Sequence, residues 1–272
     1  MVDAAVRAFL KRALEEDIGS GDITTEACVR ADARSAGSFY ARQAMVVAGV
    51  ELVPVVYELH GGASAGLLVS GGARVEAGTR LAQAEGSART LLTCERVALN
   101  LLQRLSGVAT LAAKYVDAVA GTKTRILDTR KTTPGLRRLE KAAAAAGGVV
   151  NHRMGLFDAV LIKNNHITAA GGVTEALQRV KGRSEKVEIE VRTREELEEA
   201  LAGGARHLLL DNLTPAEAAE WIRHIGERAT VELSGRISLD NVRAYAEAGA
   251  DYISCGAITH SAAAVDINFR IE

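Results

Sequence analysis

After Gly121 the sequence alternates short apolar runs with helical segments, and this alternation constrains the fold more than any other feature. The apolar runs that predict strands are 125–127, 149–151, 159–162, 187–191, 207–210, 230–233 and 252–254. The segments with helical spacing between most of them include 136–146, 173–180, 195–202, 215–225 and 239–248. Such alternation is typical of βαβ units in a parallel sheet. Because no dinucleotide glycine fingerprint opens the first unit, the pattern favours a β/α barrel over an open sheet.

The first 87 residues have a mixed pattern. Residues 2–14 have helical spacing, and a second helix is expected at 50–59. The short runs that predict strands here are 36–43, 45–48, 67–69 and 80–84. Together they predict an α+β layer, in which helices lie on a small sheet.

A long helix is expected at 88–119, with a kink or break at Ser106-Gly107. At the end of the chain, residues 266–271 alternate polar and apolar side chains, which predicts a half-exposed strand that returns to the N-terminal sheet. We therefore expect an N-terminal α+β domain over residues 1–107, joined by a C-terminal strand at 265–272, and a barrel domain over 108–264.

Composition excludes several classes of partner. With 33 Lys+Arg against 34 Asp+Glu, the net charge is −1, so no global positive field attracts nucleic acid. No uncharged apolar run approaches the roughly 20 residues that a membrane helix needs, so we expect no membrane partner. Cys28, Cys94 and Cys255 form no C-x-x-C motif, which predicts reduced thiols in a cytoplasmic protein.

Polar residues gather where the predicted barrel strands end, which is where barrel active sites lie. The first three strand ends carry mainly cationic groups: Thr129, Arg130 and Lys131, then His152 and Arg153, then Lys163. The middle strands carry carboxylates, and the last two end in small residues: Glu188, Glu190 and Asp211, then Ser234, Gly235 and Gly256. The cations predict a pocket for a multiply charged anion, because Arg matches carboxylate and phosphate groups.

The other strand ends predict a second ligand. Glu190 and Asp211 suit a hydrated Mg²⁺ or ribose hydroxyls. The glycine-containing loops after the last two strands leave backbone N–H groups for a phosphate. The pattern thus describes one ligand with carboxylates and another with phosphates, a ribose and a metal ion.

The long helix carries one polar stripe in an apolar surrounding: Thr93, Arg96, Asn100 and Gln103. This pattern predicts a buried stripe, and a buried Arg96 would need an anionic partner, which could be a ligand.

Structural interpretations stand beside these functional ones. A single Arg at a strand end is often part of a structural ion pair. Glu188 and Glu190 share one face of their strand, so both could point into the barrel and belong to an ion pair in its core. His166 could be a helix cap. Arg137, Arg138 and Glu140 are interpreted as a solvated helix face.

Several stretches are specific to one family: EEDIGSGDITT, ERVALNLLQRLSGVAT, ILDTRKTTPGLR, NHRMGLFDAVLIKNNH, VEIEV, LLLDN, VELSG and YISCGAITH. On these stretches the chain resembles the quinolinate phosphoribosyltransferases along essentially its whole length. The resemblance implies an N-terminal open-faced sandwich and an incomplete seven-stranded β/α barrel. It also implies a pentosyltransferase of NAD biosynthesis that converts quinolinate and 5-phosphoribosyl-1-pyrophosphate to nicotinate mononucleotide, CO₂ and pyrophosphate with Mg²⁺.

The resemblance also implies roles for residues. The quinolinate clamp would be Arg96, Arg130, His152, Arg153 and Lys163, with Thr129 and Lys131 beside it. Lys131 would reach towards the phosphoribosyl donor, and Glu190 and Asp211 would serve the ribose and the metal, directly or through water. The 5′-phosphate would lie at Ser234, Gly235 and Gly256. Cys255 and Asn164 are minor departures from the family pattern. The resemblance further implies a homodimer, or a larger assembly of dimers, in which Arg96 would contact substrate in the partner's site.

Two rival functions remain open at this point. One is a related phosphoribosyltransferase that uses another aromatic acid. The other is a barrel that binds anions without catalysis, although such a scaffold would not need the complete set of clamp and carboxylate residues.

Overall fold

The computed structural model describes residues 2–183 and 186–272, and it divides into two compact units. The first unit comprises Met1–Ala113, Thr133–Gly148 and Ser261–Glu272. The second comprises Lys114–Thr132 and Val149–His260. We describe each unit by itself.

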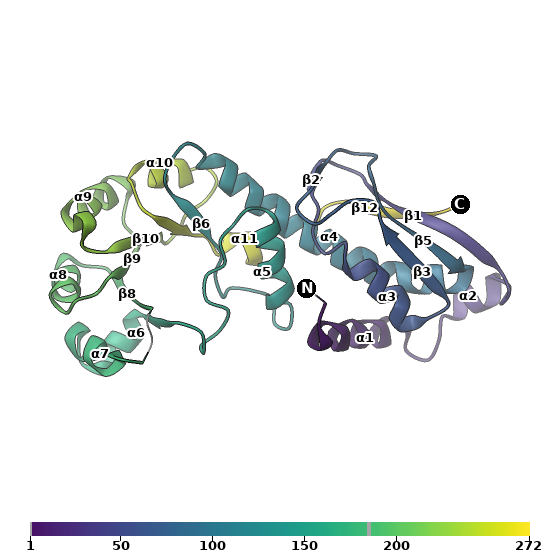
Figure 1. Cartoon of the computed structure of the whole chain (residues 1–272), viewed down its shortest axis with the longest axis horizontal. Helices are drawn as coiled ribbons and strands as arrows, with labels where there is room; N and C mark the ends of the chain where they lie inside the picture. Colours follow the sequence, from purple (N-terminus) through teal and green to yellow (C-terminus); the bar gives the residue numbers. More distant parts are fainter. Residues whose placement is uncertain (1, 184–185) are drawn as a thin grey trace. The chain divides into compact units, whose positions relative to one another are not determined.

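The first unit is built on a four-stranded sheet in the order β12-β1-β5-β3. Its strands are β1 (Arg34–Ala41), β3 (Ala63–Leu67), β5 (Arg80–Ser87) and β12 (Ile267–Ile271). All neighbours are antiparallel, and β12 at the end of the chain pairs with β1, as Figure 1 shows. The expected return of the C-terminal strand to the N-terminal sheet is therefore confirmed.

Helices complete this unit. They are α1 (Ala4–Ile18), α2 (Ile23–Cys28) and α3 (Leu52–His60), and a second, two-stranded sheet pairs β2 (Met45–Val46) with β4 (Arg74–Val75). The short helix α2 was not expected from the sequence. Its N-cap is Asp22, whose carboxylate accepts hydrogen bonds from the Thr25 amide at 2.9 Å and from the Thr93 hydroxyl at 3.0 Å.

Helix α4 (Ala88–Ala118) is continuous, so the expected break at Ser106-Gly107 is wrong. Gly107 serves close packing. A Cβ atom at this position would lie 2.1 Å from the carbonyl oxygen of Ala263, in the segment that leads back to the sheet. The absence of a side chain therefore lets that segment cross the helix.

Helix α5 (Arg137–Ala146) also belongs to the first unit. Its residues were expected to present a solvated face at Arg137, Arg138 and Glu140. Arg138 is exposed, but Glu140 is completely buried, so that expectation is wrong for Glu140. The reason is a partner from outside the helix, Arg104 on α4, which neutralises the carboxylate.

The second unit is an incomplete β/α barrel whose parallel sheet has the order β6-β11-β10-β9-β8-β7. Its strands are β6 (Arg125–Leu127), β7 (Val160–Ile162), β8 (Val187–Val191), β9 (His207–Asp211), β10 (Thr230–Ser234) and β11 (Tyr252–Ser254). The helices that follow the strands are α6 (Asn164–Ala170), α7 (Val173–Val180), α8 (Arg194–Ala202), α9 (Pro215–Ile225), α10 (Val242–Glu247) and α11 (Ala257–His260). Figure 1 shows β8, β9 and β10 inside the ring of these helices.

The strand expected at 149–151 is reduced to one bridge between Val150 and Leu127. The chain there is held by side chains of the site, described below, rather than by a ladder. Helices α6 and α11 were not expected, because each follows its strand directly and is short. With these adjustments the expected fold class, an incomplete barrel with an N-terminal α+β domain, is confirmed. Among the described residues, no helix is long and apolar enough to cross a membrane.

We predict that Gly107→Ala lowers the free energy of unfolding by about 1–3 kcal/mol, the usual cost of overpacking. Alanine favours a helix interior over glycine by about 1 kcal/mol, so helix propensity alone predicts the opposite sign. Urea unfolding of both proteins measures the difference. Gly66→Ala is the matched control, because its added methyl group meets nothing within 4 Å. An unchanged or more stable Gly107→Ala variant contradicts the crossing described above.

Candidate active site

A cavity of about 350 Å³ opens at the carboxyl ends of the barrel strands. Residues that the sequence analysis singled out line much of it: Thr129, Arg130, Lys131, His152, Arg153, Lys163, Ser234, Gly235 and Gly256. They come from the ends of β6, β7, β10 and β11 and from the residues after the Val150 bridge. The parallel strands thus bring together residues that lie more than a hundred positions apart in the chain.

Two arginines face this cavity and repel each other. Burial lowers the pKa of Arg153, and the positive charge of Arg130 lowers it further. Placing two guanidinium groups together costs free energy unless an anion lies between or beside them. The pair is therefore suited to a ligand that carries carboxylate groups.

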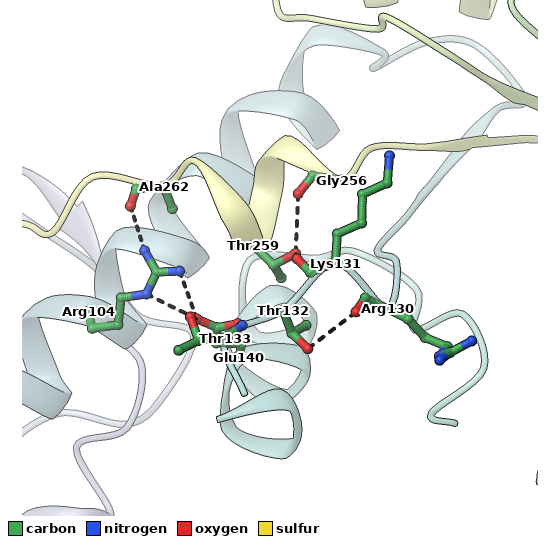
Figure 2. Close-up of polar contacts among 9 residues, drawn as sticks. All are labelled: Arg104, Arg130, Lys131, Thr132, Thr133, Glu140, Gly256, Thr259 and Ala262. Carbon is green, nitrogen blue, oxygen red and sulfur yellow. Dashed lines mark hydrogen bonds and ion pairs between the residues drawn. The ribbon is translucent and has the colours of Figure 1, made fainter. Parts of the chain in front are cut away.

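The loop that carries Arg130 and Lys131 is fixed by its backbone. The Thr259 hydroxyl on α11 donates a hydrogen bond to the Lys131 carbonyl at 2.8 Å, drawn in Figure 2. The absence of a side chain at Gly256 leaves room for the Lys131 chain, because a Cβ atom there would lie 2.7 Å from Lys131 Cδ. Substitution of Gly256 would thus displace the lysine that faces the cavity.

Thr133, two residues after Lys131, belongs to the first unit and is bonded there to the buried Glu140. The Thr133 amide and hydroxyl both donate to the Glu140 carboxylate, each at 2.9 Å. Arg104 donates to the same carboxylate at 2.7 and 3.1 Å and to the Ala262 carbonyl at 2.6 Å, as Figure 2 shows. The sequence analysis did not anticipate this ion pair: it interpreted Glu140 as part of a solvated face and did not single out Arg104, which lies on another helix.

Carboxylates lie beside the cations on the next strands. Lys163 at the end of β7 donates to Glu190 on β8 at 3.2 Å. Burial raises the pKa of Asp211 at the end of β9, and the charge of Glu190 adds to the rise, while Lys163 opposes it. Glu190 and Asp211 are therefore close enough to repel each other, although neither lines the cavity itself.

Oxygen donors from two neighbouring carboxylates fit a Mg²⁺ ion, which prefers such ligands and would relieve their repulsion. Glu190 and Asp211 are the residues that would hold it. A second group with metal-ligand spacing is His152, Glu188 and Glu232, whose ligand atoms lie within 4.8 Å of one another. Those atoms already bond to each other, so we interpret that group as a hydrogen-bonded cluster.

In this cluster the His152 ring uses both nitrogens. Nε2 lies 3.2 Å from Glu188 Oε2 and 3.4 Å from Glu232 Oε2, and Nδ1 accepts the Arg153 amide N–H at 2.7 Å. Burial acts to lower the pKa of His152, and the two carboxylates act to raise it. A second ring proton would nevertheless meet the Arg153 N–H, so the hydrogen-bond geometry assigns a neutral ring with its proton on Nε2.

The pKa values of Glu188 and Glu232 shift in opposite directions. Burial raises the pKa of Glu232. Burial acts in the same direction on Glu188, but the hydrogen bond from His152 lowers the pKa of that carboxyl overall. Glu188 is therefore the anionic member and Glu232 the one that retains a proton more readily. The ion pair expected on this strand is found at Glu190, which pairs with Lys163, whereas Glu188 accepts a hydrogen bond from His152.

Asp128 at the end of β6 is completely buried and was not singled out by the sequence analysis. Its carboxylate accepts the His152 amide at 2.8 Å and the Asn151 side-chain amide at 2.7 Å.

His166 caps α6. Its Nδ1 accepts the Lys163 amide N–H at 2.9 Å, which confirms the interpretation of His166 as a cap.

Further cavity residues were also missed. Leu161, Leu209 and Ile237 supply an apolar surface, and Arg236 and His260 add polar groups. Gly235 and Arg236 both have positive φ, 101° and 51°, so the backbone turns sharply after β10. Adjacency to Ser234-Gly235 was the signal that could have identified Arg236. Burial raises the pKa of Cys255 to about 12, which keeps this cavity thiol protonated and unreactive.

Arg96 lies in the first unit and is exposed, as is Asn100, so the expected burial of the polar stripe is wrong within one chain. The apolar face of α4 turns inward, which leaves the stripe at the surface. Arg96 lines a cavity of about 290 Å³ together with Asp17, Asp22 and Thr93. Within the described residues, Arg96 forms no hydrogen bond or ion pair with a carboxylate, although its charge acts to lower the pKa of the neighbouring Glu95, which burial raises.

Comparison with known proteins extends these observations. The family model "Quinolinate phosphoribosyl transferase, N-terminal domain" matches residues 22–106, and the model of the C-terminal domain of the same family matches residues 108–270. Nicotinate-nucleotide pyrophosphorylase [carboxylating] of Mycobacterium leprae is 43% identical, with 98% of this chain and 97% of that protein covered. A probable nicotinate-nucleotide pyrophosphorylase [carboxylating] of Bacillus subtilis is 36% identical, with 98% and 93% covered.

Solved structures agree with the sequence matches. The nicotinate-nucleotide pyrophosphorylase from Francisella tularensis has a TM-score of 0.95 and 36% identity, with 100% of this chain and 98% of that chain covered. The enzyme of the same name from Ehrlichia chaffeensis has a TM-score of 0.94 and 35% identity, covering 100% and 99%. The resemblance drawn from the sequence motifs is thus confirmed, and the chain belongs to the quinolinate phosphoribosyltransferase family.

Proposed function

We propose that this chain transfers the phosphoribosyl group of 5-phosphoribosyl-1-pyrophosphate to quinolinate with loss of CO₂. The products are nicotinate mononucleotide and pyrophosphate, and the reaction belongs to NAD biosynthesis. Relatives with 36–43% identity over nearly the whole chain carry the names nicotinate-nucleotide pyrophosphorylase and quinolinate phosphoribosyltransferase, which supports this activity.

One observation of the site carries the proposal: Arg130 and Arg153 share a cavity in which each opposes the other's charge. Lys131 and Lys163 line the same cavity. A ligand with two adjacent carboxylates would neutralise several of these cations at once. The apolar side chains of Leu161, Leu209 and Ile237 would contact the faces of an aromatic ring.

The chemistry follows from this charge arrangement. The pyridine nitrogen of quinolinate attacks C1 of the ribose, and the bond from C1 to the pyrophosphate oxygen breaks, so that its electron pair leaves with pyrophosphate. In this proposal Lys131, which lines the cavity, would stabilise the leaving group, and Glu190 and Asp211 would stabilise positive charge on the sugar. A Mg²⁺ ion held at those carboxylates would supply further charge stabilisation for the pyrophosphate.

Loss of CO₂ needs no further cofactor. Once the ring nitrogen is bonded to the ribose it carries a positive charge, which stabilises the electron pair that remains at ring C2 when the carboxylate carbon leaves. A proton then takes the place of the carboxylate. The cations of the cavity hold the ring in place during this step through its second carboxylate.

The remaining assignments are also proposals. The 5′-phosphate would lie at Ser234, Gly235 and Gly256, which line the cavity, and the backbone turns sharply at Gly235. The protein would act as a homodimer in the cytoplasm. The exposed Arg96 supports a dimer, because a symmetric pairing can place the same residue of each chain over the other's barrel.

We predict that the purified protein with quinolinate, 5-phosphoribosyl-1-pyrophosphate and Mg²⁺ releases CO₂ and pyrophosphate in equal amounts and forms nicotinate mononucleotide. Nicotinate should be a very poor substrate, because it lacks the 2-carboxylate and leaves cationic groups of the cavity without a partner. Labelled CO₂ and chromatography of the nucleotide measure both reactions, and chelation of Mg²⁺ provides a control. Comparable turnover of nicotinate, or turnover of another aromatic acid in place of quinolinate, would overturn the proposal.

Separate binding measurements test which residues serve which ligand. Arg153→Ala should weaken quinolinate binding roughly 10- to 100-fold, the usual value of a charged hydrogen bond, and change donor binding little. Asp211→Ala should do the reverse. Arg223→Ala, an exposed arginine on α9, is the matched control and should change neither. Equal losses for both ligands in the two site variants would contradict separate sites.

Mixing of inactive subunits tests the role of Arg96. If Arg96 acts in the partner's site, a heterodimer of Arg96→Ala and Lys163→Ala contains one intact site and recovers up to about half of native activity. A mixture of Arg153→Ala with Lys163→Ala is the control, because both residues belong to the same barrel and no intact site forms. Absence of recovery in the first mixture, with subunit exchange confirmed by mass spectrometry, would exclude action of Arg96 in the partner's site.

A further inference from the structure

We infer that Asp128, Glu188 and Glu232 are positioning residues that hold His152 and, through it, Arg153 at the cavity. None of the three was assigned a role as a clamp or metal residue above. The inference rests on the proposed function, because it concerns how the pocket for the dicarboxylate is kept in shape.

The backbone of His152 is held first. Asp128 is buried without exposed surface, and it ends the strand that precedes Thr129 and Arg130. It accepts the His152 amide at 2.8 Å and the Asn151 side chain at 2.7 Å. A buried carboxylate that loses such donors pays the cost of desolvation, so these contacts hold the two loops together.

The ring of His152 is held from the other side of the barrel. Glu188 lies on β8 and Glu232 on β10, the two neighbours of β9 in the sheet. The two residues retain only 6% and 3% exposure, and their Oε2 atoms lie 3.2 and 3.4 Å from His152 Nε2. Because both strands are central in the sheet, the position of the ring is set by the barrel itself.

Arg153 is held in turn by the ordered ring of His152. Its amide donates to His152 Nδ1 at 2.7 Å, and its guanidinium donates through Nη1 to the Ala159 carbonyl at 3.3 Å. Rotation of the imidazole would break the hydrogen bond from the Arg153 amide and, at the same time, the contacts with the two glutamates. The arrangement explains how a segment with a single β-bridge can present an arginine in a defined position.

Charge adds to geometry. The negative charge of Glu188 favours the charged form of Arg153, against burial and the repulsion from Arg130. A carboxylate at position 188 therefore supports Arg153 in two ways, through the imidazole and through space. A neutral side chain that still accepts the Nε2–H bond would retain only the first.

The test compares Glu188→Leu, which removes the acceptor, with Glu188→Gln, which keeps an acceptor oxygen and the side-chain length. We expect Glu188→Leu to raise the KM for quinolinate roughly tenfold or more while the donor KM stays within about twofold. Glu188→Gln should stay within roughly threefold of the native KM. A variant that only misfolds in part loses active sites and therefore kcat, not KM. An unchanged quinolinate KM, or equal rises for both substrates, in Glu188→Leu overturns the inference.

Asp128→Asn provides a second variant, should Glu188→Leu fail to fold. It keeps one acceptor oxygen and loses the other, so the quinolinate KM should rise while the donor KM does not. A rise in both, or in neither, counts against the inference.

A measurement without turnover separates this inference from the proposed function. The chain has six histidines, so ¹⁵N-histidine labelling gives few ring signals, and His152→Gln identifies that of His152. In the native protein we expect the proton on Nε2 and an unprotonated Nδ1 at pH 7. Protonation at Nδ1 would exclude the bond from Arg153 and overturn the inference. Absence of quinolinate turnover together with the expected ring state would instead overturn the proposed function alone.

Discussion

The repulsion between Arg130 and Arg153 is the constraint on which the site depends. In the absence of an anionic ligand, the protein must hold the two guanidinium groups at one cavity despite their electrostatic repulsion. For Arg153 the barrel meets this requirement with buried carboxylates. Asp128 and Glu188 are buried, and each is bonded to the segment that carries His152 and Arg153. Arg153 is thus held at the cavity by a segment that is bonded to buried carboxylates.

The order of strands separates the two kinds of ligand chemistry. Cationic residues end β6 and β7 or follow the Val150 bridge, and the carboxylates Glu190 and Asp211 belong to β8 and β9. Lys163 lies at the boundary, where it faces the cavity and also pairs with Glu190. This ion pair links the two regions of the site. Such a link suits a reaction in which one substrate attacks the other.

Sequence patterns predict local structure, but they do not predict contacts between residues that are distant in the chain. The barrel strands and the residues at their ends were predictable, because a parallel sheet gathers its carboxyl ends at one edge. The supporting residues were not. Glu140 has the spacing of a surface residue, and only Arg104, 36 residues earlier, accounts for its burial. Gly107 has the appearance of a helix break, although its reason is a segment more than 150 residues later in the chain. Arg96 lies in an apolar sequence and is nonetheless exposed.

The most direct test of this account is a crystal structure with quinolinate bound at near-atomic resolution. We predict that the guanidinium groups of Arg130 and Arg153 contact its carboxylates in the barrel cavity. We also predict that His152 keeps its bonds to Glu188 and to the Arg153 amide, without rotation of the ring. Quinolinate bound outside this cavity, or a His152 ring that leaves Glu188 to bind the ligand through Nε2, would contradict the account.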